Sequence, residues 1–117
     1  MSMDIADSKV KDNLADHQKE ELNKAFRELS KVLAYNQDAD LTEEFLKSLL
    51  TEKEVEEVAS RWALVRLIDQ GMSQRNISSK LGLSLCKITR GSKELKKEHS
   101  PFRRMIDLYN KRKQSGL

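Results

Sequence analysis

The chain has 117 residues, which suits a single domain, and its single cysteine, Cys86, excludes a disulfide within the chain. Charged residues make up 35% of the chain and hydrophobic residues 38%, with one proline and four glycines, and this mixture favours helices over sheets. No apolar run approaches the roughly 20 residues that a membrane helix needs. The N-terminal sequence also lacks the apolar core of a signal peptide. We therefore expect a small helical protein of the reducing cytoplasm, without a membrane partner.

The charge is distributed unevenly along the chain. Residues 1–70 hold 10 Lys or Arg against 16 Asp or Glu, whereas residues 71–117 hold 12 against 3. Such asymmetry indicates a basic surface that binds a polyanion such as nucleic acid. On charge alone, a solvated basic C-terminal segment is an equally good interpretation.

The first predicted helix follows a polar N-terminal segment. Residues 1–15 have no apolar stripe, and we interpret them as a mobile arm or a frayed helix start. From Asp16 to about Asn36, apolar residues recur at three- and four-residue steps, as on one face of a helix; they are Leu22, Ala25, Phe26, Leu29, Val32 and Leu33.

Two capping boxes predict the next two helices. Asp40 followed by Glu43 opens a short helix that runs through Leu50. Thr51 followed by Glu54 opens a longer helix that runs to about Gln70. This longer helix is apolar over so much of its circumference that we expect it to lie at the centre of the fold. For Trp62, a place in the core or at a dimer interface is a better interpretation than a ligand site.

Three short helices are predicted after Gly71, which ends the long helix. Ser73 caps a helix that reaches about Lys80, and Ser84 caps the next one after a turn at residues 81–83. Ser100 followed by proline opens the last helix, because proline is favoured at the first helical position. The residues after about Asn110 look like a basic tail. The main domain is thus predicted over residues 16–113, with a C-terminal tail over residues 114–117.

The segment from Ser73 to Arg90 has the spacing of a helix-turn-helix. Two short helices that cross steeply need a small residue where they touch, and Ser78 supplies it. The turn needs a residue that tolerates positive φ, and Gly82 supplies it. Three apolar side chains then point inward and hold the unit together, namely Ile77, Leu81 and Ile88.

The second helix of this unit would present its N-terminal half to base edges in the major groove of DNA. Leu85 and Cys86 would contact thymine methyl groups, while Thr89 and Arg75 would contact bases or phosphates. Lysines would contact phosphates without reading the sequence; the candidates are Lys80, Lys87, Lys93, Lys96 and Lys97. Ser78 and Ser84 are also placed at the DNA interface. A purely structural helical hairpin is the alternative.

Other classes of function fit the sequence less well. The two histidines, His17 and His99, have no nucleophile or carboxylate arranged around them, and no Cys/His spacing suggests a metal site. We therefore predict no enzymatic activity and no metal. For Cys86, a small side chain that contacts DNA is a better interpretation than a redox or metal sensor. A helical protein-interaction module with a basic tail is a more distant alternative.

Three pieces of the chain resemble the bacterial Trp repressor family. They are Leu50-Thr51 before a long helix that contains Arg61, then residues 71–75 (Gly-Met-Ser-Gln-Arg), and residues 88–92 (Ile-Thr-Arg-Gly-Ser) followed by Leu95-Lys96. The last run is the most specific. The similarity is strong over residues 50–96 and extends in layout over residues 16–113.

The resemblance implies an all-α fold of about six helices per subunit in an intertwined homodimer. It also implies a sequence-specific repressor of tryptophan biosynthesis or transport genes, with two helix-turn-helix units on a pseudo-palindromic double-stranded operator. L-Tryptophan would be the corepressor, bound between the central helix and the recognition helix, where it favours the DNA-competent state.

The resemblance also implies the ligand residues. Arg61 and Arg90 would sandwich the indole ring, and Arg90 would meet the ligand carboxylate. Val65 and Gly91 would line the pocket, because a side chain at Gly91 would intrude on the indole. From the other subunit, the polar end of the ligand would meet the Thr51 side chain and the backbone of Ser48 and Leu50.

The chain departs from the family pattern at a few positions. Lys93 and Glu94 stand where the family commonly has Asn and a small residue, often serine near the ligand ammonium. Glu94 would bind the ammonium more strongly, fill the pocket, pair with Arg90 or Lys97, or select another ligand. The loop before Met72 is one residue shorter than in the best-known members, and Ser78 replaces a basic residue. A regulator that ignores tryptophan or responds to another effector is therefore the main alternative.

Overall fold

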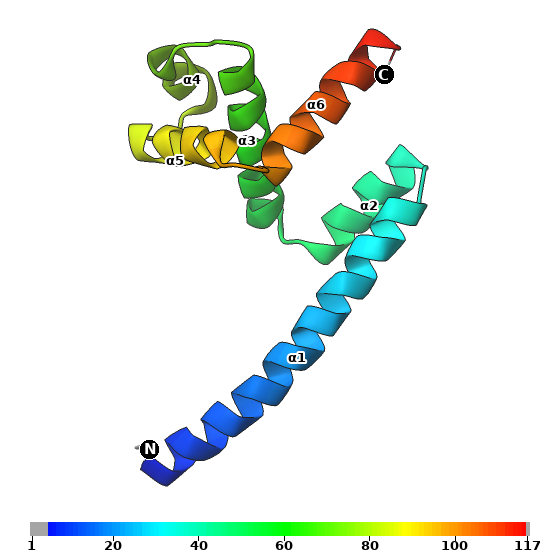
Figure 1. The fold of residues 1–117 in the computed structure, drawn as a ribbon, viewed down its shortest axis with the longest axis vertical. Helices are drawn as coiled ribbons and strands as arrows, with labels where there is room; N and C mark the ends of the chain where they lie inside the picture. Colours follow the sequence, from blue (N-terminus) through cyan, green and yellow to red (C-terminus); the bar gives the residue numbers. More distant parts are fainter. Residues whose placement is uncertain (1–4, 117) are drawn as a thin grey trace. The chain divides into compact units, whose positions relative to one another are not determined.

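The computed structural model describes the backbone of residues 5–116 and the side chains of residues 15–116. This part of the chain contains six helices and no strand, which confirms the predicted all-α fold (Figure 1). The helices are α1 (Ile5–Tyr35), α2 (Ala39–Leu49), α3 (Glu52–Asp69), α4 (Gln74–Leu81), α5 (Leu85–Lys96) and α6 (Pro101–Gln114). The chain divides into two units, residues 1–48 and residues 49–117, and each is described by itself.

The first unit contains α1 and most of α2, and α1 begins at Ile5, well before the predicted start at Asp16. The prediction placed this start too late because it relied on the apolar stripe, and a polar sequence without proline also forms a helix. Residues 1–4 of the predicted arm lie outside the described residues, and the mobility of the arm stays a prediction.

The capping residue of α2 is Asp38, and the prediction of Asp40 was wrong. The Asp38 carboxylate accepts hydrogen bonds from the backbone N–H groups of Asp40 and Leu41, at 3.1 and 3.2 Å. The Asn36 side chain supports this turn by accepting a hydrogen bond from the backbone N–H of Asp38. Asp40 instead lies in the first turn of α2, where its negative charge suits the positive end of the helix dipole.

The first unit buries none of its described side chains. Several of the apolar residues that define the stripe of α1 are largely exposed, among them Leu22 at 67% and Phe26 at 70%. Most apolar side chains of α2 are exposed as well, with Leu41 at 52% and Phe45 at 38%. The helical pattern predicted for this unit is therefore present, while its apolar face is only partly covered within the unit, where Leu29, Leu33 and Leu46 are half-buried.

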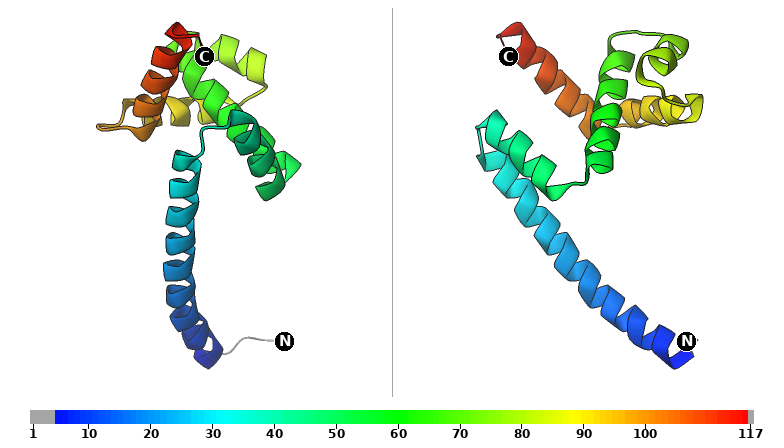
Figure 2. Two further views of the ribbon diagram at one scale, coloured as in Figure 1. Left: turned by 90° about the vertical axis from the view of Figure 1, so that its right-hand side faces the viewer. Right: turned by 180° about the vertical axis from the view of Figure 1, so that it is seen from behind.

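The second unit is built around α3, which packs against α4, α5 and α6. The predicted capping box of α3 is confirmed, since Thr51 Oγ1 accepts from the Glu54 N–H at 3.1 Å and Glu54 Oε1 accepts from the Thr51 N–H at 2.9 Å. The hydrogen bond from the Thr51 backbone N–H lowers the pKa of the Glu54 carboxyl group, and the Thr51 side chain adds to this effect. Helices α4 and α5 lie on one side of α3, and α6 runs away from the other side (Figures 1 and 2).

Two clusters of buried side chains hold the second unit together. The first joins α3 to α4 and α5 and consists of Leu64, Leu67, Ile77 and Ile88. The second joins α3 to α5 and α6 and consists of Val65, Leu95 and Ile106. Trp62 packs against this second cluster and meets the Tyr109 ring edge to face at 5.9 Å, which supports its predicted place in the core.

Helices α4 and α5 form the predicted pair around a tight turn. Ser73 and Ser84 cap them, accepting hydrogen bonds from the N–H groups of Asn76 and Lys87. Gly82 ends α4 with φ of 67°, the left-handed conformation that the prediction required of it. The Ser78 hydroxyl donates to the Leu83 carbonyl oxygen at 2.7 Å, which ties α4 to the residue just before α5.

The last helix begins at Pro101 after the buried cap Ser100, as predicted. It continues to Gln114, so the basic segment predicted as the start of a tail is helical as far as that residue; residue 117 lies outside the described residues. Its cations at residues 111–113 suit the negative end of the helix dipole.

An ion pair fixes α6 to the end of α3. Arg103 donates a hydrogen bond to the Asp69 carboxylate at 2.5 Å, and Asn110 donates another at 3.0 Å. The hydrogen bonds from Arg103 and Asn110 lower the pKa of Asp69. They also anchor the beginning and the end of α6 to one residue of α3.

Candidate functional site

Helix α5 presents an exposed face that contains three of the predicted recognition residues. Leu85, Cys86 and Thr89 are exposed, and Leu85 is 57% exposed despite its apolar side chain. Together with Arg90 and Lys93 they line a shallow depression. The sequence therefore placed these side chains correctly on the outside of the helical pair, at the N-terminal half of its second helix.

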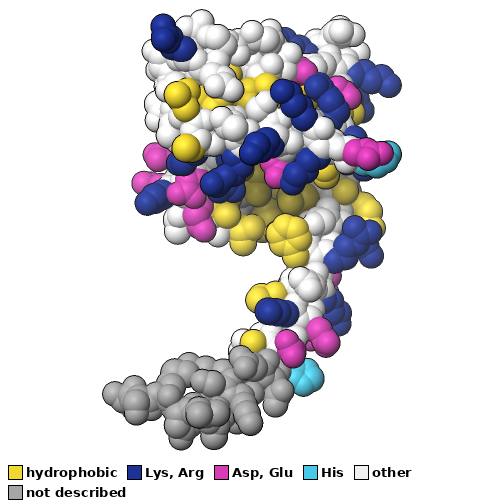
Figure 3. Space-filling model, turned by 60° about the vertical axis from the view of Figure 1, so that its left-hand side comes forward, with side chains coloured by type: hydrophobic (Ala, Val, Ile, Leu, Met, Phe, Trp, Pro, Cys, Tyr) yellow, Lys and Arg dark blue, Asp and Glu magenta, His cyan; other side chains and the backbone are white. Residues whose placement is uncertain are grey.

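The predicted phosphate-binding lysines are all exposed. Figure 3, in which the side of the molecule that bears α4 and α5 comes forward, shows several Lys and Arg side chains on this face. Arg75 and Ser84 are exposed as well, although the Ser84 hydroxyl is occupied in the α5 cap. Ser78 is half-buried and its hydroxyl bonds to Leu83, so the structure gives it a role in the turn, and its contact with DNA stays a prediction.

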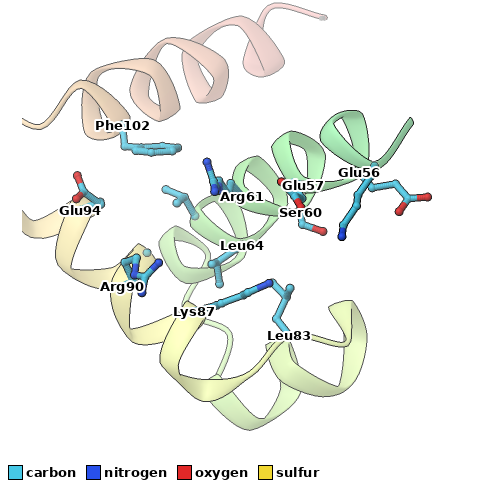
Figure 4. Close-up of a pocket in the computed structure, with 13 residues that line it drawn as sticks. Glu56, Glu57, Ser60, Arg61, Leu64, Leu83, Lys87, Arg90, Glu94 and Phe102 are labelled. Carbon is cyan, nitrogen blue, oxygen red and sulfur yellow. The ribbon is translucent and has the colours of Figure 1, made fainter. Parts of the chain in front are cut away.

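A cavity of about 680 Å³ lies between α3, α5 and the start of α6. Five of the eight residues predicted for a ligand line it, namely Arg61, Val65, Arg90, Gly91 and Glu94. Figure 4 shows that Arg61 comes from α3 and Arg90 from α5. The geometry thus brings together two residues that are far apart in the sequence.

The two arginines of the cavity, Arg61 and Arg90, form no ion pair with another described residue. A guanidinium group offers several N–H donors in one plane and a flat face that stacks on aromatic rings. The cavity can therefore bind an anionic group, and it can hold a flat ring against a guanidinium face.

Glu94 pairs with Lys97, one of the partners considered for it. The Lys97 Nζ lies 2.7 Å from the Glu94 Oε1, and the two side chains are 61% and 42% exposed. Glu94 still lines the cavity from α5, near the start of α6 (Figure 4). Together with Glu56 and Glu57 on α3, Glu94 gives the cavity three carboxylates in addition to its arginines.

Gly91 of α5 lies against the side chain of Leu64 on α3. A Cβ atom on Gly91 would lie 2.9 Å from Leu64 Cδ2 and 3.2 Å from Leu64 Cγ. Leu64 is 3% exposed, so its side chain has little room to move away. A side chain at Gly91 would thus force Leu64 to shift, whatever the glycine contributes to room for a ligand.

The other three predicted ligand residues do not line this cavity. The Ser48 hydroxyl donates to the Glu44 carbonyl oxygen, and the Thr51 hydroxyl caps α3. The resemblance assigns Ser48, Leu50 and Thr51 to the ligand site of a partner subunit. Their role in ligand binding stays a prediction.

Several lining residues were missed by the sequence analysis. The missed residues of α3 lie on the same helix face as Arg61, and Lys87 lies on the same face of α5 as Arg90, three residues before it. Helix periodicity could therefore have identified them. They are Lys53, Glu56, Glu57, Ser60, Leu64, Leu83, Lys87 and Phe102. Phe102 carries no such signal, because its position depends on how α6 packs.

Two further observations concern only the described part of the chain. No group of three or more metal-binding side chains occurs there. Likewise, none of the helices in that part is both long enough and apolar enough to span a membrane.

Comparison with known proteins identifies relatives. The family model described as Trp repressor protein matches residues 24–109, which is most of the chain. A Trp operon repressor homolog of Xylella fastidiosa is 38% identical over 72 residues, which cover 61% of this chain and 78% of the relative. A second such homolog, from Chlamydia trachomatis, is 38% identical over 69 residues, 55% of this chain and 73% of the relative.

The homolog of Chlamydia caviae is 36% identical over 70 residues, 59% of this chain and 69% of that relative. No solved structure matches the chain. The matched region contains the α4–α5 pair and the arginine-lined cavity together. The chain belongs to the Trp repressor family.

Proposed function

We propose that this chain is a homodimeric, sequence-specific repressor that binds double-stranded operator DNA and takes L-tryptophan as its corepressor. Its targets would be genes for tryptophan biosynthesis or transport, and its compartment the cytoplasm. Membership of the Trp repressor family makes the chain a Trp-repressor-like regulator. We propose no enzymatic activity and no metal for it.

The DNA-binding part of the proposal is supported by the α4–α5 pair. A recognition helix must expose its N-terminal half to reach base edges, and α5 exposes Leu85, Cys86 and Thr89 there. The surrounding exposed cations suit the phosphate backbone, which supplies affinity without sequence preference. Arg75 and Lys80 on α4 add to this basic surface.

The observation that carries the proposal is the place of Arg90. This residue lines the cavity between α3 and α5 and also the depression beside Leu85, Cys86 and Thr89. A ligand that binds Arg90 and Arg61 would thereby fix the angle between α5 and α3. Because a ligand shifts an equilibrium only toward the state that it binds more tightly, such contacts are what a corepressor needs.

The dimeric part of the proposal is supported by the first unit. Exposed apolar side chains follow one another along α1 and α2, and none of the described side chains of this unit is buried. Isolated helices are marginally stable in water, and they gain their stability by burying an apolar face. A second copy of the chain would cover these faces and would supply Ser48, Leu50 and Thr51 to the ligand site.

Calorimetric titration with L-tryptophan tests the proposal. We expect saturable binding near one ligand per subunit for the wild type and no measurable binding for Arg90→Ala. Arg75→Ala is the matched control, since Arg75 is exposed and does not line the cavity, and it should bind tryptophan like the wild type. No heat from the wild type at millimolar tryptophan would contradict tryptophan as the corepressor.

A second candidate is a regulator of the same fold that responds to a different effector. The observation that favours it is Glu94, a carboxylate on the cavity wall. Titration of other aromatic ligands separates the two candidates. Ligand-independent operator binding, equal in the presence and absence of every effector tested, would identify the chain as a regulator without an effector.

A further inference from the structure

Helix α5 begins with two exposed side chains that the core of the second unit does not use. Leu85, its first residue, is 57% exposed, and Cys86 beside it is exposed as well. The neighbouring side chains of Leu83 and Ile88 instead pack into or against the first buried cluster. Among the described residues, Leu85 and Cys86 belong to neither of the two clusters. Their apolar surface is therefore available to a binding partner.

The charges around these two side chains favour nucleic acid as that partner. Arg90 and Lys93 border the same depression on α5, and the exposed Lys87 follows Cys86 directly. None of these three cations forms an ion pair with a described residue. DNA offers both matching features, since phosphates flank the base edges of its major groove. An apolar protein partner would instead remove water from the charges without pairing them.

The chemistry of Leu85 and Cys86 limits what they can read on a base pair. A leucine side chain has no hydrogen-bonding group, and a thiol is a weak donor and a weak acceptor. They are therefore poorly suited to distinguish the O4 acceptor of thymine from the N4 donor of cytosine in the major groove. What apolar side chains contact on a base edge there is the C5 methyl group of thymine. In 5-methylcytosine, a methyl group occupies the same position of the pyrimidine ring.

Thr89 adds no discrimination between the two pyrimidines. It lines the same depression one helical turn beyond Leu85. Its hydroxyl group can donate or accept a hydrogen bond, so it can meet either the O4 of thymine or the N4 of cytosine. The exposed N-terminal half of α5 is thus better suited to detect the methyl group than to detect the rest of the pyrimidine.

We propose that Leu85 and Cys86 read the C5 methyl group of pyrimidines, so that operator binding responds to methylation of cytosine at C5 as well as to thymine. This inference rests on the proposed function, in which α5 contacts base edges. It extends that function by naming a modification of the operator that regulates binding. Where cytosine replaces a contacted thymine and weakens binding, methylation of that cytosine restores part of the affinity.

Fluorescence anisotropy on a duplex selected from a random library tests this inference. The selection is made with and without L-tryptophan, and binding is measured under the condition that enriches a sequence. Each thymine of a half-site is then replaced by uracil, which removes only the methyl group. We expect at least one replacement to weaken binding about fourfold, the factor that burial of one methyl group contributes. At the same position, 5-methylcytosine should bind about fourfold more tightly than cytosine.

Leu85→Ala and Cys86→Ser test the assignment of the methyl contact to these residues. At least one of them should lose both preferences and bind the uracil duplex nearly as the wild type does, because that duplex has no methyl group to contact. Lys93→Gln is the matched control, since it removes a cation from the edge of the same depression. It should weaken binding to every duplex alike and keep both preferences. Circular dichroism shows whether each variant keeps its helices.

The outcomes separate this inference from the proposed function. Loss of both preferences in Leu85→Ala or Cys86→Ser supports the inference. Preferences that persist in both variants overturn it, because the methyl group then acts through the shape of the DNA. A wild type that binds 5-methylcytosine and cytosine equally at every position also overturns it, and leaves operator binding standing. Failure to enrich any sequence under either condition overturns the inference and sequence-specific DNA binding together.

Discussion

At the scale of single residues, Gly91 controls how closely α5 approaches α3. The Leu64 side chain occupies the space that a Cβ atom on Gly91 would take, and Leu64 is buried on its other sides. The same glycine borders the cavity that holds Arg61 and Arg90. A substitution here acts on stability and on the shape of the cavity at once.

We predict that Gly91→Ala lowers the free energy of unfolding by about 1 kcal/mol, because overpacking outweighs the gain in helix propensity. Urea denaturation at one fixed protein concentration measures this change. In a Leu64→Ala background the clash is absent, so Gly91→Ala should there be neutral or stabilising. Equal losses in both backgrounds would show that the contact with Leu64 is not the cause.

At the scale of the helices, the contact between α3 and α6 depends on Asp69. Arg103 and Asn110 both bind this half-buried carboxylate, and the first of them also pairs with Asp107 at 2.9 Å. Asp107 is 62% exposed, whereas the Asp69 side chain is 17% exposed. The two carboxylates share one arginine and differ mainly in burial, so they form a natural pair for comparison.

We predict that Asp69→Asn lowers the free energy of unfolding at neutral pH by about 1–2 kcal/mol, and that Asp107→Asn costs about 0.5 kcal/mol or less. The folded state lowers the pKa of Asp69, so its stabilising effect is present above the ordinary pKa of the group and is lost as pH falls through the lowered value. The difference in free energy of unfolding between the wild type and Asp69→Asn should therefore become smaller as the pH falls. A difference that becomes larger in acid would show that the ionised Asp69 carboxylate is not what stabilises the fold.

Recognition by α5 makes a different prediction for Thr89 and Lys93. Thr89→Ala should weaken binding to selected operator sites by about 1 kcal/mol and leave nonspecific binding nearly unchanged, because it removes a contact with base edges. Lys93→Gln should weaken both kinds of binding alike and reduce their salt dependence. Fluorescence anisotropy over a range of salt concentrations measures both. A similar loss for Thr89→Ala on every DNA would remove it from base recognition.

The helices that were predicted well are those with strong local signals. Thr51, Ser73, Ser84 and Ser100 cap their helices as predicted, because a cap depends on residues within three positions of it. Asp38 was missed because Asp40, two residues later, has the same carboxylate side chain and is equally suited to a cap. The hydrogen bond that the Asp38 N–H donates to the Asn36 side chain belongs to the turn in which Asp38 becomes the cap, and the sequence does not reveal this turn.

The candidate site was predictable in part. The resemblance supplied Arg61, Val65, Arg90, Gly91 and Glu94, all of which line one cavity. Phe102 and the pairing of Glu94 with Lys97 could not be predicted, since they depend on side-chain placement and on the packing of α6.

At the scale of the whole molecule, the exposed apolar side chains of α1 and α2 indicate that another protein surface covers them. Phe26, Val32 and Tyr35 are each more than half exposed on one helix. Exposed apolar side chains on helices that bury none of their own are typical of an interaction surface in a soluble protein. The proposed homodimer would bury this surface and place two α4–α5 pairs on the two halves of an operator.

We predict that Phe26→Asp shifts the protein from dimer toward monomer and lowers its helical content, because α1 then loses its cover. Sedimentation and circular dichroism measure the two effects. Lys24→Asp introduces the same side chain outside the apolar stripe and should leave the dimer intact. Dissociation by both variants alike would indicate a general effect of charge.

In the proposed function, an effector bound between α3 and α5 controls DNA binding by α5. Selection of double-stranded fragments from a random library, with and without L-tryptophan, tests it most directly. We expect enrichment of a pseudo-palindromic sequence in the presence of tryptophan, and loss of that enrichment when tryptophan is omitted or when Arg90 is replaced by Ala. Enrichment of the same sequence with and without tryptophan, or of none in either case, would contradict the claim.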